Sequence, residues 1–177
     1  AYVPATTVKA AEDLSGKLVV IHTNDMHGRY AADSKEGSLG MSTVTALKGY
    51  YQKQGANVLL LDAGDFSQGT NLVNYYKGLD AIYFMNAAGY DAASLGNHEF
   101  DYTLDYIQKQ LSSTGMSGKV VLSNVTNVNT GAHIWAENKI ITKNLVTESG
   151  KTISVKVGLI GETVPTLAKK RTNYTGV

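Results

Sequence analysis

The chain has 177 residues, of which 43% are hydrophobic and 18% are charged, and its formal net charge is +1. This length allows one domain with its own core, and the near-neutral charge argues against a basic face for a nucleic-acid duplex. The absence of cysteine excludes disulfides, thiolate metal ligands and a thiol nucleophile. No apolar run approaches the roughly 20 residues of a transmembrane helix, so we expect no transmembrane segment.

Residues 1–16 are small, polar and weakly patterned, which is typical of an N-terminal arm. The chain begins at Ala1 without a methionine, so either a leader was removed or a longer chain was cut at this point. On the first interpretation we expect a periplasmic or extracellular location.

Apolar runs and segments of helical spacing then alternate. The runs predict buried strands over residues 17–23, 57–65 and 119–125, and a short strand followed by a turn within residues 91–101. Apolar spacing predicts helices over residues 39–54 and 80–88, and a further helix marked by Leu104, Ile107 and Leu111.

The pattern changes near the end of the chain. Two β-rich runs, residues 139–145 and 152–160, flank the sequence "TESGK" and predict a hairpin with a Ser-Gly turn. Strand-helix alternation followed by a hairpin predicts a layered α/β fold whose sheet is not purely parallel.

Three successive predicted strands are followed by potential ligand groups. The groups are Asp25 and His27, then Asp62 and Asp65, then Asn97, His98, Glu99 and Asp101. Ligands of open α/β sheets bind at the carboxyl ends of the strands, so we expect these side chains to converge. Nitrogen and oxygen ligands without sulfur suit Mn, Zn, Fe or Co. Two such ions, roughly 3.5–4 Å apart, form the clamp used for phosphate-ester displacement.

Each motif alone also has a purely structural interpretation. Asp-x-His is common in loops, Gly64-Asp65 is typical of turns, and Asn97 could cap a turn. Their conjunction, each after a β-run, carries the metal hypothesis. We expect His22 to be a hydrogen-bonded core residue, and His133 to be partly exposed.

Two further expectations concern residues near these motifs. Asp62 is expected to support the Asp65 loop through backbone hydrogen bonds. The segment "NYYKGLDAIYF" (residues 74–84) has aromatics at helical spacing, which favours a place in the core over a shelf for stacking a base.

Three motifs together resemble the calcineurin-like metallophosphoesterases. They are "TNDMHG" (23–28), "DAGDFSQGT" (62–70) and "GNHEFDY" (96–102). The Thr-Asn-Asp start and the Phe-Asp after His-Glu resemble the branch of 5′-nucleotidases, UDP-sugar hydrolases and 2′,3′-cyclic nucleotide phosphodiesterases. "VLSNVT" (121–126) and "VGLIGETVP" (157–165) are similar to later strands of that branch. The resemblance implies part of a four-layer α/β/β/α sandwich with a mixed sheet, with residues 17–177 as the N-terminal portion of the catalytic domain.

The resemblance also implies roles for single residues. Asp25 and His27 would bind the first metal, Asp65 would bridge two metals, and Asn97 would bind the second. Asn97 and His98 would contact the substrate phosphate, and His98 would assist the leaving group. Asp101 would orient His98. Glu99 is assigned no chemistry and is expected to accept hydrogen bonds from backbone N–H groups.

Part of the family pattern is absent from this sequence. The family continues with further Gly-His motifs and a nucleoside-binding domain, whereas this chain has no histidine after His133. We therefore expect a fragment with an incomplete second metal site, weak metal binding and little activity in isolation. We also expect exposed apolar surface that promotes self-association.

The expected function of the full-length protein is two-metal hydrolysis of nucleotide or nucleotide-sugar phosphate esters, without a nucleic-acid duplex as partner. The alternative is a secreted, non-catalytic binding module that retains the fold. A Rossmann or P-loop domain is disfavoured because neither glycine-rich phosphate motif follows a strand.

Overall fold

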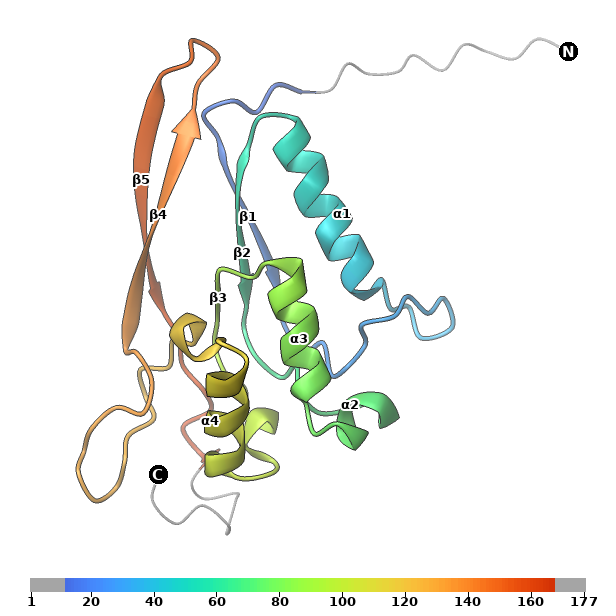
Figure 1. Cartoon of the computed structure of the whole chain (residues 1–177), viewed down its shortest axis with the longest axis vertical. Helices are drawn as coiled ribbons and strands as arrows, with labels where there is room; N and C mark the ends of the chain where they lie inside the picture. Colours follow the sequence, from blue (N-terminus) through green and yellow to red (C-terminus); the bar gives the residue numbers. More distant parts are fainter. Residues whose placement is uncertain (1–11, 168–177) are drawn as a thin grey trace, which may run out of the picture.

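The computed structural model describes residues 12–167 of the chain. Three parallel strands form the central sheet in the order β1-β2-β3. They are β1 (Leu18–Thr23), β2 (Asn57–Asp62) and β3 (Ala92–Ala93). A separate antiparallel hairpin, β4 (Asn138–Val146) and β5 (Thr152–Ile160), lies beside this sheet (Figure 1). The predicted α/β class, with parallel and antiparallel strands, is confirmed.

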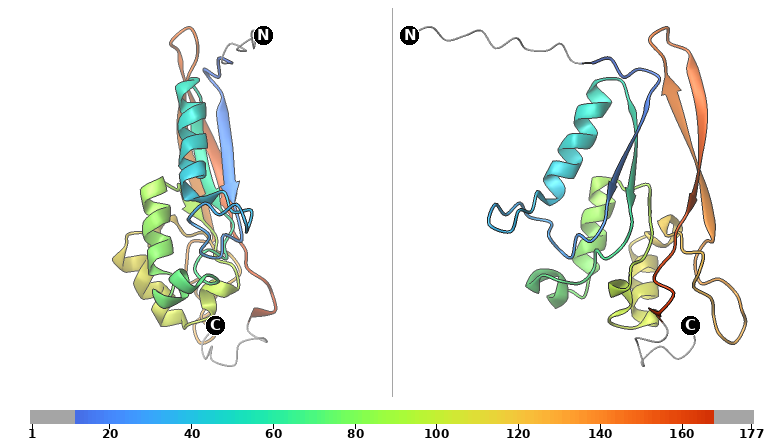
Figure 2. Two further views of the ribbon diagram at one scale, coloured as in Figure 1. Left: turned by 90° about the vertical axis from the view of Figure 1, so that its right-hand side faces the viewer. Right: turned by 180° about the vertical axis from the view of Figure 1, so that it is seen from behind.

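Helices connect the parallel strands, as such strands require. They are α1 (Gly40–Lys53), the short α2 (Asn71–Tyr75) and α3 (Leu79–Ala88). A 3-10 turn, η1 (His98–Phe100), α4 (Leu104–Ser113) and a second 3-10 turn, η2 (Ser117–Lys119), follow β3. The helices gather on one side of the parallel strands (Figure 2).

Local sequence explains where these helices begin and end. Helix α3 lies between Gly78 and Gly89, whose φ angles of 83° and 72° are left-handed and favour glycine. Thr103 caps α4, because its hydroxyl accepts a hydrogen bond from Tyr106 N at 3.1 Å. The three helices predicted from the sequence are therefore present, and the five-residue α2 was not predicted.

The core fills the space between the helices and the strands. Leu60, Ile82 and Leu111 are completely buried there, and they come from β2, α3 and α4. The hairpin is joined to the central sheet by polar contacts, which include an ion pair of 2.7 Å between Lys143 Nζ and Asp91 Oδ1.

The prediction of a strand over residues 119–125 is wrong, because these residues do not form a continuous ladder with one neighbouring strand. Val120 and Val121 form only isolated parallel bridges, with Ala93 and Ala136 respectively. Leu122 N donates to the carbonyl of Ala136, and Ser123 N donates to that of Gly161. Different segments thus satisfy successive backbone groups, so the apolar run is buried without forming a regular strand.

The prediction of a buried strand over residues 17–23 holds for only one face of β1. Ile21 faces the core, whereas Val20 is 53% exposed and His22 is exposed. Successive side chains of a strand point to opposite faces of the sheet, and the helices cover only one of those faces. His22 is therefore not the core histidine that the sequence suggested.

None of the helices in the described part of the chain is long and apolar enough to cross a bilayer. Most of the expected N-terminal arm, residues 1–11, lies outside the described residues, as do residues 168–177 with Arg171. The assignment of residues 1–16 to an arm and of 17–177 to a partial catalytic domain stays a prediction.

Candidate metal centre

The loops after the three parallel strands meet at the carboxyl end of the sheet. Thr23 pairs with Asp62, and Asp62 pairs with Ala93, so the three strands end at nearly the same level. Asp25 and His27 follow β1, Asp65 follows β2, and η1 follows β3. The predicted convergence of these loops is therefore present.

Backbone hydrogen bonds join the first two loops. Asp25 N donates to the carbonyl of Gly64 at 3.0 Å, and His27 N donates to that of Asp65 at 2.9 Å. Asp25, His27 and Asp65 have φ angles of 51°, 47° and 57°. These left-handed conformations are uncommon for residues other than glycine and cluster at functional sites.

Asp25, His27 and Asp65 form a group that suits a divalent cation. One potential ligand atom from each side chain lies within 4.8 Å of the others. His27 Nδ1 is 2.8 Å from the carbonyl of Gln68, which can only accept, so Nδ1 carries the hydrogen. That bond leaves the Nε2 lone pair of His27, 3.8 Å from Asp25 Oδ1, available to a metal.

The Gly96–Glu99 turn packs directly against Asp65. His98 N donates to Asp65 Oδ1 at 2.8 Å, and the His27 and His98 rings lie 5.2 Å apart. A Cβ at position 96 would lie 2.2 Å from Asp65 Oδ1, so only glycine fits. Asn97 lies in the chain between Gly96 and His98, which both contact Asp65, and it is half-buried.

Glu99 holds this turn onto the Asp65 loop. Its carboxylate is 1% exposed and accepts hydrogen bonds from the backbone N–H groups of Asp65, Phe66, Ser67 and Gly96, at 2.7 to 2.9 Å. Burial raises the pKa of Glu99, and the donated hydrogen bonds oppose that rise. The expected contact with backbone N–H groups is confirmed.

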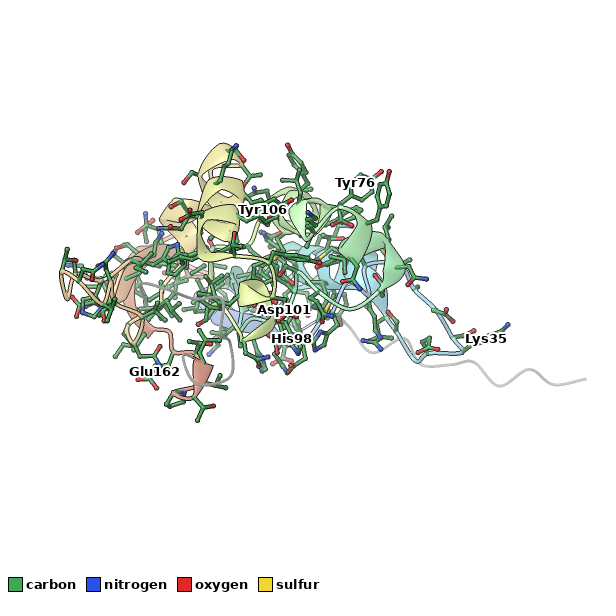
Figure 3. All side chains as sticks on the ribbon, turned by 90° about the horizontal axis from the view of Figure 1, so that it is seen from below. Lys35, Tyr76, His98, Asp101, Tyr106 and Glu162 are labelled. Atoms are coloured by element: carbon green, nitrogen blue, oxygen red, sulfur yellow. The ribbon has the colours of Figure 1, made fainter. Side chains whose placement is uncertain are left out.

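His98 and Asp101 form a pair beside the cation group. His98 Nδ1 lies 2.7 Å from Asp101 Oδ2, and the two side chains lie next to each other on the face viewed in Figure 3. The side chain of His98 is 33% exposed and that of Asp101 is 16% exposed. A carboxylate at Nδ1 fixes the ring and directs Nε2 away from Asp101.

Asp62 supports the two loops that follow β1 and β2. It is 5% exposed, accepts a hydrogen bond from Gly64 N at 2.8 Å, and accepts another from the Thr23 hydroxyl. Burial raises the pKa of Asp62 to about 7, against the lowering effect of these two hydrogen bonds. The predicted supporting role, through a backbone hydrogen bond, is confirmed.

The remaining candidates are His133 and the aromatics of residues 74–84, which are not among the three residues of the cation group. His133 is partly exposed, as predicted, and its Nε2 is 3.0 Å from Glu137 Oε1. The expectation that the aromatics of residues 74–84 belong to the core is wrong. Tyr75, Tyr76 and Tyr83 are 79%, 50% and 60% exposed, because α2 is a short surface helix and α3 buries its other side.

Sequence reasoning missed the carbonyl of Gln68, which orients His27. It also missed the close approach that requires Gly96. Gln68 gives no signal in a single sequence, since any residue supplies a carbonyl. The glycine directly before Asn-His was a visible signal for a tight contact.

A parallel sheet with a helical layer and an Asp-His-Asp group at its carboxyl end defines an α/β protein with a candidate metal centre. Residues 18–165 match the family model described as calcineurin-like phosphoesterase. The chain belongs to the calcineurin-like phosphoesterase family.

Comparisons with individual proteins agree. The chain is 32% identical over 167 residues to a 5′-nucleotidase of Vibrio vulnificus, covering 92% of this chain and 28% of that protein. It is 31% identical over 186 residues to a 2′,3′-cyclic-nucleotide 2′-phosphodiesterase/3′-nucleotidase of Yersinia enterocolitica, covering 97% of this chain and 28% of that protein. The crystal structure of the calcineurin-like phosphoesterase YfkN from Bacillus subtilis is similar, with a TM-score of 0.73 and 30% identity over 86% of this chain and 50% of that one.

Proposed function

We propose that this chain carries part of a metal-dependent phosphoesterase centre, and that the whole protein hydrolyses phosphate esters of nucleotides. The observation that supports this most is the group of Asp25, His27 and Asp65, whose ligand atoms lie within 4.8 Å of one another. The contact between this group and the turn that carries Asn97 and His98 adds to it.

In this proposal Asp25 and His27 would hold a first divalent ion, Asp65 would contribute to both sites, and Asn97 would contribute to the second. Such ions, when bound, neutralise phosphate oxygens and activate a water molecule. The carboxylate and imidazole donors suit Mn, Zn, Fe or Co. The second site is proposed to be incomplete in this chain, because Asn97 and Asp65 are the only ligands that we assign to it.

His98 is proposed to contact the phosphate and to donate a proton to the leaving oxygen. Asp101, at 2.7 Å from Nδ1, accepts the hydrogen of that nitrogen and stabilises the protonated ring. The proton for the leaving group then resides on Nε2. Asn97, the residue next to His98, is proposed to contact the same phosphate.

The names of the relatives support nucleotides as the substrate class. One relative is named as a 5′-nucleotidase and another as a cyclic-nucleotide phosphodiesterase with 3′-nucleotidase activity. The chain spans 28% of the length of each. We propose 5′-monoester hydrolysis as the first reaction to test. A periplasmic or extracellular location is part of the proposal.

Metal titration of this chain tests the proposed centre. We expect Mn²⁺ to bind the chain, as measured by calorimetry or electron paramagnetic resonance. Asp65→Asn should weaken that binding at least about tenfold. Asp105→Asn removes an exposed carboxylate from the first turn of α4 and serves as the matched control. Equal affinity in both variants would contradict the proposal.

A further inference from the structure

Helix α2 lies beyond the carboxyl ends of the parallel strands (Figure 1), next in the chain to the loop that orients His27. That loop contains Gln68, whose carbonyl oxygen is 2.8 Å from His27 Nδ1. A backbone carbonyl keeps the hydrogen of an imidazole on Nδ1 only while the carbonyl itself is held in place. The Gln68–Gly69 peptide therefore needs a restraint of its own.

Gly69 gives this peptide little intrinsic rigidity. A Cβ at position 69 would lie 2.7 Å from His27 Cβ and closer still to the carbonyl oxygen of His27, so the approach of the two loops requires glycine. Glycine has more backbone freedom than any other residue. Hydrogen bonds from outside the loop must then keep the Gln68 carbonyl against the imidazole.

Asn74 on α2 supplies two such hydrogen bonds. Its Oδ1 accepts from Gly69 N at 3.0 Å, and its Nδ2 donates to the carbonyl of Gly69 at 3.0 Å. Two bonds from one planar amide fix the orientation of the backbone as well as its position. The hydroxyl of Thr70 accepts from Val73 N and caps α2, which keeps Asn74 close to Gly69.

The same side chain reaches the segment that carries the second histidine. The hydroxyl of Tyr102 donates to Asn74 Oδ1 at 3.5 Å, and Tyr102 follows Asp101, the partner of His98. This hydrogen bond is long and therefore weak. The main effect of Asn74 is thus expected at His27, through Gly69.

We propose that Asn74 is a positioning residue for His27. It holds the Gln68 carbonyl in place, so that His27 keeps its hydrogen on Nδ1 and presents the lone pair of Nε2 to a cation. This inference rests on the role of His27 as a metal ligand in the proposed function. Without Asn74 the peptide can turn away, and the ring can adopt the other tautomer, in which the hydrogen occupies Nε2.

The tautomer of His27 tests this role without a metal. It is measured by long-range ¹H–¹⁵N NMR of the 177-residue chain at pH 8.5 with a chelator present, and loss of signals in His27→Asn identifies His27 among the four histidines. We expect the Nδ1–H form in the wild type and a mixture with the Nε2–H form in Asn74→Ala. Asn71→Ala removes the other asparagine of α2, is the matched control, and should leave the tautomer unchanged.

A conservative variant separates positioning from a general effect on stability. Asn74→Asp keeps the acceptor for Gly69 N and loses the donor, so it should restore part of the Nδ1–H population. If α2 only stabilised the fold, Asn74→Ala would lower the melting temperature and leave the tautomer as it is. Gly69→Ala, at the other end of the contact, should shift the tautomer in the same direction as Asn74→Ala.

Mn²⁺ titration of the same variants supplies the second measurement. Asn74→Ala should weaken Mn²⁺ binding at least about threefold, which is less than the roughly 10–100-fold loss on removing a direct partner of a ligand. An unchanged tautomer in Asn74→Ala, an equal shift in Asn71→Ala, or a wild-type ring in the Nε2–H form would overturn the proposal. Expected tautomers in a wild type that does not bind Mn²⁺ would leave the positioning of His27 intact and contradict the proposed metal centre.

Discussion

Glu99 shows how one buried carboxylate can organise a candidate metal site without being one of the assigned ligands. It accepts hydrogen bonds from a backbone N–H of its own turn and from three N–H groups of the Asp65 loop, which lies more than thirty residues before Glu99 in the chain. Its neighbour His98 donates a backbone hydrogen bond to Asp65. The position of Asp65 relative to His98 therefore depends on Glu99.

Replacing Glu99 with glutamine should disturb both stability and metal binding. The amide NH₂ would face backbone N–H donors, and each buried group left without a partner costs about 1–3 kcal/mol. We expect a lower melting temperature by calorimetry and weaker Mn²⁺ binding. Glu137→Gln, at an exposed position, is the control. An unchanged Mn²⁺ affinity in Glu99→Gln would show that Glu99 does not position the metal centre.

His98 and the cation ligands should respond differently to substitution. In the whole protein, His98→Asn should slow hydrolysis of an aryl phosphate by roughly 10²–10⁴-fold, the usual range for a general acid. Metal content should stay nearly unchanged, because His98 is not among the assigned ligands. Loss of metal from His98→Asn, compared with His133→Asn, would show that the division of roles is wrong.

At the scale of elements, the site depends on close contact between the loops after β2 and β3. A Cβ at Gly96 would lie 2.2 Å from Asp65 Oδ1, whereas one at Gly118 meets no atom within 4 Å. Gly96→Ala should therefore weaken Mn²⁺ binding strongly, because Asp65 must move. Gly118→Ala should have no effect on the same titration. Comparable Mn²⁺ affinities of the two variants would contradict the packing described here.

Asp62, the last residue of β2, should make the stability of the chain depend on pH. The pKa of Asp62 is raised from 3.8 to about 7 in the folded chain, so the folded state binds the extra proton between these values. The free energy of unfolding should then fall as pH rises from about 4 to about 7, by up to about 1.4 kcal/mol per pH unit from this group.

Chemical denaturation across this pH range, with a chelator present, measures that slope. Asp62→Asn should flatten it, because the amide does not titrate and can still accept from Gly64 N and contact the Thr23 hydroxyl. A slope that is identical in both proteins would show that Asp62 is ionised in the folded state.

The sequence predicted the elements best where the local pattern and the tertiary environment agree. The long helices α1 and α4 and the hairpin have clear periodicity, and the ligands lie at strand ends that chain order reveals. Residues 119–125 were predicted less well because their backbone partners lie on separate segments. The exposure of Tyr75 and Tyr83 depends on which helix face meets the core, and helical spacing alone does not specify that face.

At the scale of the whole molecule, the hairpin presents apolar side chains to solvent. Ile140, Val146 and Ile160 are 67%, 53% and 76% exposed, and the strand register places them on one face. Exposed apolar patches favour association. We expect sedimentation of the chain to depend on concentration, and Ile140→Thr with Ile160→Thr to reduce that dependence. A monomer at every concentration would contradict this expectation.

Anomalous diffraction from crystals of the chain grown with Mn²⁺ tests the central claim most directly. We expect a manganese peak within coordination distance of Asp25, His27 and Asp65, and none at the His133–Glu137 pair on the surface. A peak confined to His133 and Glu137, or no peak near Asp65 at saturating Mn²⁺, would contradict the assignment of the metal centre.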